Sequence, residues 1–197
     1  MTIARNTPNK LTSATLRRLC FLTAAAAWLA NAGCDSNGAI GSDAYVAGTY
    51  TVSVSWGKNG CTSLKETDSW KEGSPPASNI PLDIMQADAS NMISGKVGGI
   101  PAIFVGLLHG TTDYSGTVKG SVVDLNIYGK LARSLGACSY TWNGNVHGEL
   151  NGDSLAGTIR YFPAGNGSPE CPRCTAEQLF NGTRPPGSGT PPNKRVP

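Results

Sequence analysis

The sequence has few of the residues from which hydrolytic active sites are built. It contains two histidines, and we expect His109 at the end of a strand and His147 on an outward-facing strand position. Asp124, Glu149 and Asp153 fall at solvent-facing or turn positions, where carboxylates are common. No Gly-x-Ser-x-Gly, His-Glu-x-x-His or calcium-loop motif is present. The sequence therefore favours a non-catalytic protein that uses no cofactor and no metal ion.

The chain also lacks an excess of charge of one sign once its first residues are set aside. It has 16 basic and 13 acidic residues in total. Four of the basic residues and none of the acids precede Cys34, which leaves 12 against 13, a net charge of −1. Surfaces that bind nucleic acid carry clustered positive charge. A nucleic-acid partner is therefore not expected.

The amino-terminal apolar run, residues 19–30, is too short to cross a membrane. A spanning helix needs about 20 apolar residues, and Asn31, Gly33 and Asp35 end this run. Basic residues precede it without one acid, which is the layout of a secretory signal. The run is also apolar all round, unlike the amphipathic helices of globular proteins. Residues 1–33 are thus predicted to be an export signal.

Two cleavage sites compete at the end of this signal. Ala30-Asn31-Ala32 has the small-x-small form that precedes an ordinary cut, which would fall before Gly33. Ala32-Gly33-Cys34 resembles the lipobox of bacterial lipoproteins, although Asn31 stands where a lipobox usually carries Leu. That resemblance implies cleavage just before Cys34 and attachment of a lipid to its sulfur.

The number of cysteines favours lipidation of Cys34. Of six cysteines, Cys20 leaves with the signal, so an ordinary cut would leave five in an oxidising compartment. Lipidation leaves four that can pair completely: Cys61, Cys138, Cys171 and Cys174. Residues 34–44 are rich in Gly and Ser and would form a flexible tether. We therefore expect an exported protein of the periplasm or cell surface that is anchored to the membrane by the lipid on Cys34. Secretion after a cut behind Ala32 is the alternative.

Apolar residues in the remaining chain recur with a period of two. Residues 49–56, 121–128 and 154–161 alternate apolar and polar side chains, which indicates half-buried strands. Turn signals lie at Lys119-Gly120 and at Asn151-Gly152-Asp153. Short segments at 131–135 and 175–180 are the candidate helices. We predict an all-β domain over 45–180, followed by a disordered tail rich in Pro and Gly over 181–197.

A glycine motif recurs within the predicted sheet. "SGKVGG" at 94–99, "SGTVKG" at 115–120 and "NGNVHG" at 143–148 share the spacing of two glycines around a valine. Glycine suits positions where a strand bends or bulges so that a small barrel can close. A phosphate-binding loop would instead need a helix directly after the glycines. The pattern predicts a small antiparallel meander that forms a closed or partly closed barrel of about six to eight strands.

Two features of this pattern resemble the calycin group, which includes the lipocalins. Gly48-Thr49-Tyr50 opens the first strand where that family has Gly-x-Trp, with Tyr50 in place of the Trp. Arg160 lies in what we take as the last strand, where the family often places an Arg against that aromatic ring. The resemblance implies an apolar pocket inside the barrel. Three tryptophans are candidates for lining such a pocket or for filling the core: Trp56, Trp70 and Trp142.

The Cys-Pro-Arg-Cys motif at Cys171 and Cys174 allows three interpretations. It is similar to the active site of thiol–disulfide oxidoreductases, which need a helix after the first cysteine. Four cysteines would also suffice for zinc, although Cys61 and Cys138 lie far apart in the sequence. We prefer structural disulfides that join Cys61 and Cys138 each to one cysteine of the motif. The leading hypothesis is a non-catalytic envelope lipoprotein that binds a small apolar ligand or a partner protein, with the oxidoreductase as the alternative.

Overall fold

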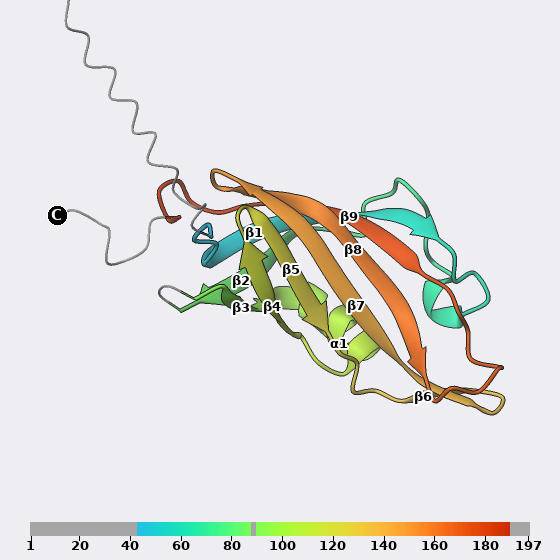
Figure 1. Cartoon of the computed structure of the whole chain (residues 1–197). Helices are drawn as coiled ribbons and strands as arrows, with labels where there is room; N and C mark the ends of the chain where they lie inside the picture. Colours follow the sequence, from blue (N-terminus) through green and yellow to red (C-terminus); the bar gives the residue numbers. More distant parts are fainter. Residues whose placement is uncertain (1–42, 88–89, 190–197) are drawn as a thin grey trace, which may run out of the picture. The chain divides into compact units, whose positions relative to one another are not determined.

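The computed structural model describes residues 43–87 and 90–189. The predicted signal, the lipidation site Cys34, nearly all of the tether and residues 190–197 of the tail lie outside the described residues. Figure 1 shows the order of the elements that the structure does describe. The strands are β1 (Gly48–Asn59), β2 (Ala77–Gln86), β3 (Met92–Val97), β4 (Asp113–Lys119), β5 (Val122–Ile127), β6 (Arg133–Leu135), β7 (Cys138–Asn151), β8 (Ser154–Gly165) and β9 (Ala176–Thr183). The helices are η1 (Lys65–Thr67) and α1 (Gly99–His109).

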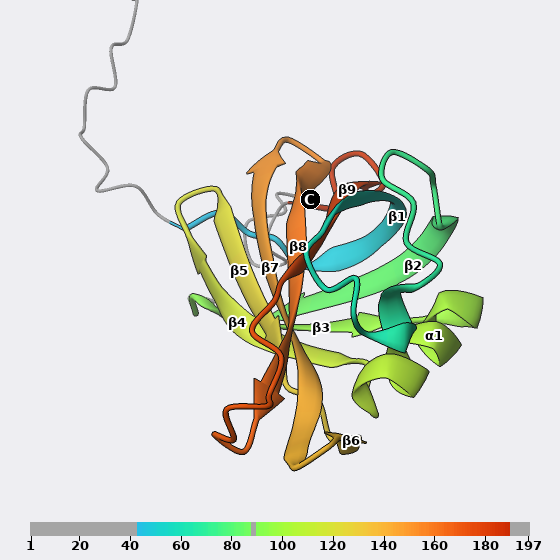
Figure 2. The same cartoon turned by 90° about the vertical axis from the view of Figure 1, so that its right-hand side faces the viewer.

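Eight of these strands close into one antiparallel barrel. Each pairs with the next along the chain, β5 pairs with β7, and β1 pairs with β9 to complete the ring (Figure 2). The short strand β6 lies outside the ring and pairs only with the beginning of β7. The prediction of an all-β antiparallel barrel is confirmed, and the architecture is compatible with a calycin-like fold.

Alternation along the strands builds the barrel core. In β7, every second residue faces inward, and the large ones among them are buried: Cys138, Tyr140, Trp142, Val146 and Leu150. The glycines of this strand keep the same phase, and Gly148 lies opposite Gly157 of β8. A Cβ atom on Gly157 would collide with the main-chain carbonyl of His147. Here the missing side chain lets two strands approach closely, whereas the glycine pattern had been interpreted as marking bends or bulges.

Tight turns join the strands at the two predicted positions. Gly120 lies between β4 and β5 with φ of 59°, and Gly152 lies between β7 and β8 with φ of 61°. Glycine adopts this left-handed conformation without the steric penalty of a Cβ atom. Both hairpins therefore follow from local turn chemistry.

A buried arginine closes the end of the barrel that carries these turns. Arg184, directly after β9, lies 5.5 Å from the centre of the Tyr50 ring. Its guanidinium donates hydrogen bonds to the carbonyls of Tyr45 and Ala47 and pairs with Asp153 at 3.0 Å. The Tyr50 hydroxyl donates to the carbonyl of Val46 at 2.9 Å. The segment before β1 is thus held across this end by groups that leave no charge unpaired.

The expectation that Arg160 contacts the Tyr50 ring was wrong. Arg160 lies in β8, its side chain is 63% exposed, and it forms an ion pair with Glu177 on the outer surface. The error came from taking β8 as the last strand, since β9 had been interpreted as a helix. Arg184 occupies the position against the aromatic ring, four residues beyond the expected domain end at Phe180.

Both candidate helices were also wrong. Residues 131–135 contain strand β6, and residues 176–180 begin strand β9. The α-helix in the described residues is instead α1. It ends at His109, which we had expected at the end of a strand. A short run that is apolar all round does not distinguish a buried helix from a buried strand. The local signals were Pro101 in the first turn and Gly110 in the left-handed conformation after the last.

Candidate functional site

The barrel contains a cavity of about 480 Å³. It runs from apolar side chains deep in the barrel to the exposed residues Ser69, Pro76 and Leu107, so it reaches solvent between the loop 60–76 and α1. Most of its wall is apolar; the deep part is formed by Leu125, Val146, Leu155 and Phe180. This volume lies within the range of about 300–1,000 Å³ that is typical of small-molecule sites.

A row of aromatic rings forms one wall of the cavity. Trp56 of β1 lies 3.9 Å from Trp70, ring centre to ring centre, and Trp70 lies 6.1 Å from Tyr161. His109 continues the row at 5.5 Å from Tyr161. The indole nitrogen of Trp70 donates to the carbonyl of Gly57 at 3.0 Å, which fixes the ring against β1. These planar side chains offer a rigid apolar surface to a bound molecule.

Two disulfides hold the loops at this end of the barrel. Cys61 is bonded to Cys174 and Cys138 to Cys171, which agrees with the preferred pairing. The first bridge ties the loop that carries Trp70 to the loop before β9. Such bridges are typical of proteins in oxidising extracellular or periplasmic environments.

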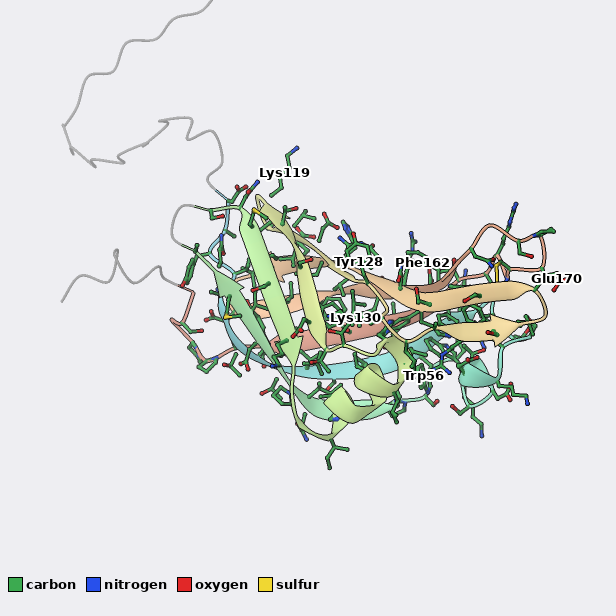
Figure 3. All side chains as sticks on the ribbon, turned by 90° about the horizontal axis from the view of Figure 1, so that it is seen from below. Trp56, Lys119, Tyr128, Lys130, Phe162 and Glu170 are labelled. Atoms are coloured by element: carbon green, nitrogen blue, oxygen red, sulfur yellow. A yellow bond between two sulfur atoms is a disulfide. The ribbon has the colours of Figure 1, made fainter. Side chains whose placement is uncertain are left out.

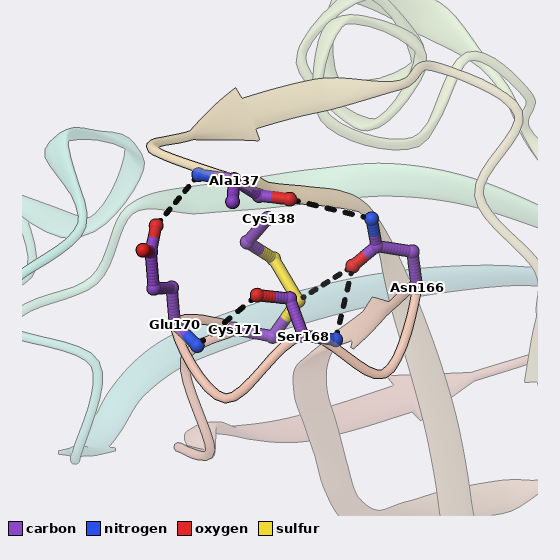
Figure 4. Close-up of a disulfide and its surroundings, with 6 residues drawn as sticks. All are labelled: Ala137, Cys138, Asn166, Ser168, Glu170 and Cys171. Atoms are coloured by element: carbon purple, nitrogen blue, oxygen red, sulfur yellow. Dashed lines mark hydrogen bonds between the residues drawn. A yellow bond between two sulfur atoms is a disulfide. The ribbon is translucent and has the colours of Figure 1, made fainter.

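The second bridge is surrounded by a hydrogen-bonded loop (Figure 4). Glu170 accepts a hydrogen bond from the main-chain nitrogen of Ala137, and the Asn166 amide donates to the carbonyl of Ala137 at 3.4 Å. Glu170 lies at the opposite end of the barrel from Lys119 (Figure 3). The bridged loops therefore belong to the end at which the cavity opens, far from the end closed by Arg184.

Helix α1 covers part of the cavity and is fixed at both ends. Before it, the nitrogen of Gly98 donates to the carbonyl of Pro81 at 2.9 Å. At its last turn, the nitrogen of Lys130 donates to the carbonyl of His109 at 2.6 Å, and Arg133 donates to the carbonyl of Leu107 at 2.8 Å. The two bonds at the last turn use main-chain carbonyls that a helix end leaves without partners. They position the inner face of α1 as part of the cavity wall.

His109 is fully buried, and one of its two ring nitrogens has no partner. Nδ1 lies 2.6 Å from the carbonyl oxygen of Trp142, which can only accept, so Nδ1 carries the hydrogen. Nε2 is left as a buried acceptor without a hydrogen bond. Burial lowers the pKa of His109, the bond to Trp142 offsets part of this, and the charge of Arg133 lowers it further. The ring is therefore neutral in this wall near pH 7.

Two further buried side-chain atoms in the described residues have no hydrogen bond, one on Arg133 and one on Trp142. Within residues 43–87 and 90–189, the buried side-chain atoms without a hydrogen bond are Nε2 of His109, Nε of Arg133 and Nε1 of Trp142. Arg133 is otherwise satisfied, because Nη1 pairs with Glu66 at 3.1 Å. Buried polar atoms without partners are rare and destabilising. Two of these atoms belong to His109 and Arg133, which line the cavity at the last turn of α1, and we call this part of the lining the polar corner of the cavity.

The three tryptophans named from the sequence take different places. Trp56 and Trp70 line the cavity, whereas Trp142 is 1% exposed and packs in the core cluster behind it. Sequence reasoning missed His109, Arg133 and Gln178, all of which line the cavity. Gln178 lies in β9 on the same buried face as Ala176 and Phe180. The spacing of two between these residues was the signal in the sequence that could have identified a strand here.

The remaining polar candidates lie on the surface. His147 bonds to Asp124 at 2.7 Å, with both side chains largely exposed. Glu149 is exposed at the end of β7, and Asp153 is used by Arg184. No three His, Cys, Asp or Glu side chains are placed to hold a metal ion within the described part of the chain.

Cys171 and Cys174 are bonded to different partners and not to each other. The segment after Cys174 is strand β9, so the motif does not open the helix that stabilises a reactive thiolate in oxidoreductases. Both cysteines of the motif therefore serve as structural bridges between loops.

No helix in the described residues is long and apolar enough to cross a membrane. Comparisons of the chain with protein-family models, curated protein sequences and solved structures find no match. Function is therefore inferred from the cavity and its residues.

Proposed function

We propose that the protein is a non-catalytic cell-envelope lipoprotein that holds a small apolar ligand inside its barrel. The observation that carries this proposal is the cavity of about 480 Å³ with a largely apolar wall that reaches solvent beside α1. The amino-terminal sequence supports export and attachment to the membrane through Cys34.

The cavity favours binding over catalysis. Its polar groups are few, and the charged ones among them already pair with each other, Arg133 with Glu66 at 3.1 Å. An apolar molecule that enters the cavity removes its surface from water, which favours binding by about 25 cal/mol of free energy per Å² of apolar surface buried. Disulfide-held loops and the fixed helix mean that little ordering is needed on binding, which favours affinity.

Filling the cavity should weaken binding. We expect the full chain to bind the neutral probe N-phenyl-1-naphthylamine with a saturable rise in probe fluorescence. Val54 lines the cavity, and Val54→Trp should weaken binding at least tenfold because the indole occupies the space of the probe. Ser53 is exposed on the opposite face of β1, so Ser53→Trp is the matched control and should bind like the unchanged chain.

The probe titration has a result that would contradict the proposal. Equal binding by the Val54→Trp and Ser53→Trp variants would place the probe outside the barrel. Circular dichroism and cooperative unfolding of both variants would show that they fold.

A further inference from the structure

The polar corner of the cavity limits what its ligand can be, given the ligand-binding function proposed above. His109 is 0% exposed and contributes to the cavity wall, and its Nε2 has a free lone pair. The tautomer is fixed by the bond from Nδ1 to the carbonyl of Trp142. Nε2 can therefore only accept a hydrogen bond. A molecule that complements this wall must bring a donor.

Arg133 contributes the opposite kind of atom. Its Nε carries a hydrogen that finds no acceptor, although the other two nitrogens of the guanidinium bond to Glu66 and to the carbonyl of Leu107. Through that second bond, Arg133 is tied to the helix turn that ends at His109. The lining of the cavity thus includes one residue with an unused acceptor and one with an unused donor.

We propose that the ligand is an apolar molecule with a neutral hydroxyl group, which donates to Nε2 of His109 and accepts from Nε of Arg133. A hydroxyl is both donor and acceptor, so it matches the two unused atoms. A carboxylate has no hydrogen for Nε2, and its charge would face Glu66. An ammonium would face Arg133 and would have to give up its hydration in a largely apolar site. Long-chain or cyclic alcohols are the ligand class that this wall fits.

A pair of ligands with the same chain separates this proposal from simple apolar binding. 1-Decanol and decyl methyl ether share their alkyl chain, but the ether has no hydrogen to donate. We expect 1-decanol to displace N-phenyl-1-naphthylamine from the full chain about tenfold more tightly than the ether, because it satisfies a buried acceptor. Decanoate should bind more weakly than the alcohol at pH 7. A purely apolar cavity would instead prefer the ether, which carries one more methyl group.

The preference for the alcohol should depend on His109. His109→Phe keeps a planar ring of similar size without Nε2, and it should reduce the alcohol-to-ether ratio to about twofold or less. His147→Phe makes the same change on the exposed outer surface and should leave the ratio at about tenfold. The comparison on the unchanged chain remains decisive if His109→Phe does not fold.

The outcomes of this experiment separate the two proposals. If the ether binds as tightly as the alcohol, or the ratio survives His109→Phe, the hydroxyl assignment is wrong while the apolar cavity stands. If neither the probe nor either ligand binds, both proposals are wrong.

Discussion

Replacing Arg184 by Met is expected to lower the free energy of unfolding by about 3 kcal/mol, because it removes a buried charge from the partly buried Asp153 carboxylate and from two carbonyls that accept its hydrogen bonds. The Arg184 side chain is 2% exposed and lies against Tyr50. Met keeps the apolar stem but removes every donor. The carboxylate of Asp153 and the carbonyls of Tyr45 and Ala47 would lose their hydrogen bonds. Urea unfolding at pH 7 measures the difference.

The matched control for this variant is Arg160→Met. Arg160 is 63% exposed and pairs with Glu177 on the outer surface. Exposed pairs of this kind contribute at most about 1 kcal/mol, so this variant should unfold almost like the unchanged chain. Similar losses in the two variants would mean that Arg184 does not close the barrel as described. Arg184→Lys should fall between, since one ammonium cannot reach all of the partners.

Removing the Cys61–Cys174 disulfide should destabilise the protein more than removing the other bridge. In the chain-entropy model, a disulfide stabilises by restricting the unfolded chain, and the effect grows with the length of the closed loop. The sequence separation is 113 for Cys61–Cys174 and 33 for Cys138–Cys171. The paired alanine variants should lose about 4–5 and about 3–4 kcal/mol respectively.

The two disulfide variants also differ in their relation to the cavity. Cys61 begins the loop that places Trp70 against Trp56, so its loss should also weaken probe binding. The Cys138–Cys171 bridge joins the β6–β7 turn to the loop before β9. Urea unfolding of each paired alanine variant measures its loss of unfolding free energy. The alanines leave no free thiols that could re-pair during the measurement. A larger loss for the Cys138 and Cys171 variant would contradict the loop-length explanation.

The barrel could be predicted from the sequence because its strands alternate. In β1 and β5, apolar and polar residues occupy opposite faces in a way that only a strand explains. The four cysteines allow three pairings, and the observed one is among the two that we preferred, in which Cys61 and Cys138 each join one cysteine of the motif. Alternation is a local property and the number of cysteines can be counted, so a single sequence contains both, whereas the choice between the two preferred pairings depends on the fold.

The candidate site could not be predicted to the same extent. Helix α1 is apolar on nearly every position, and its type was decided by packing over the barrel end, which no local pattern records. His109 becomes important only because that helix buries it beside Arg133, 24 residues later in the chain. Gln178 interrupts the apolar face of β9, and its polarity is explained by the hydrogen bond that it accepts from Tyr161 at 2.8 Å.

The position of a bound bromine atom would test the ligand-binding account most directly. Crystals of the protein grown with 10-bromodecan-1-ol would locate the bromine by its anomalous scattering. The account predicts a peak inside the ring of strands, with the hydroxyl oxygen within hydrogen-bond distance of Nε2 of His109. Bromine peaks found only on the outer surface, with the cavity filled by water or by shifted side chains, would contradict it.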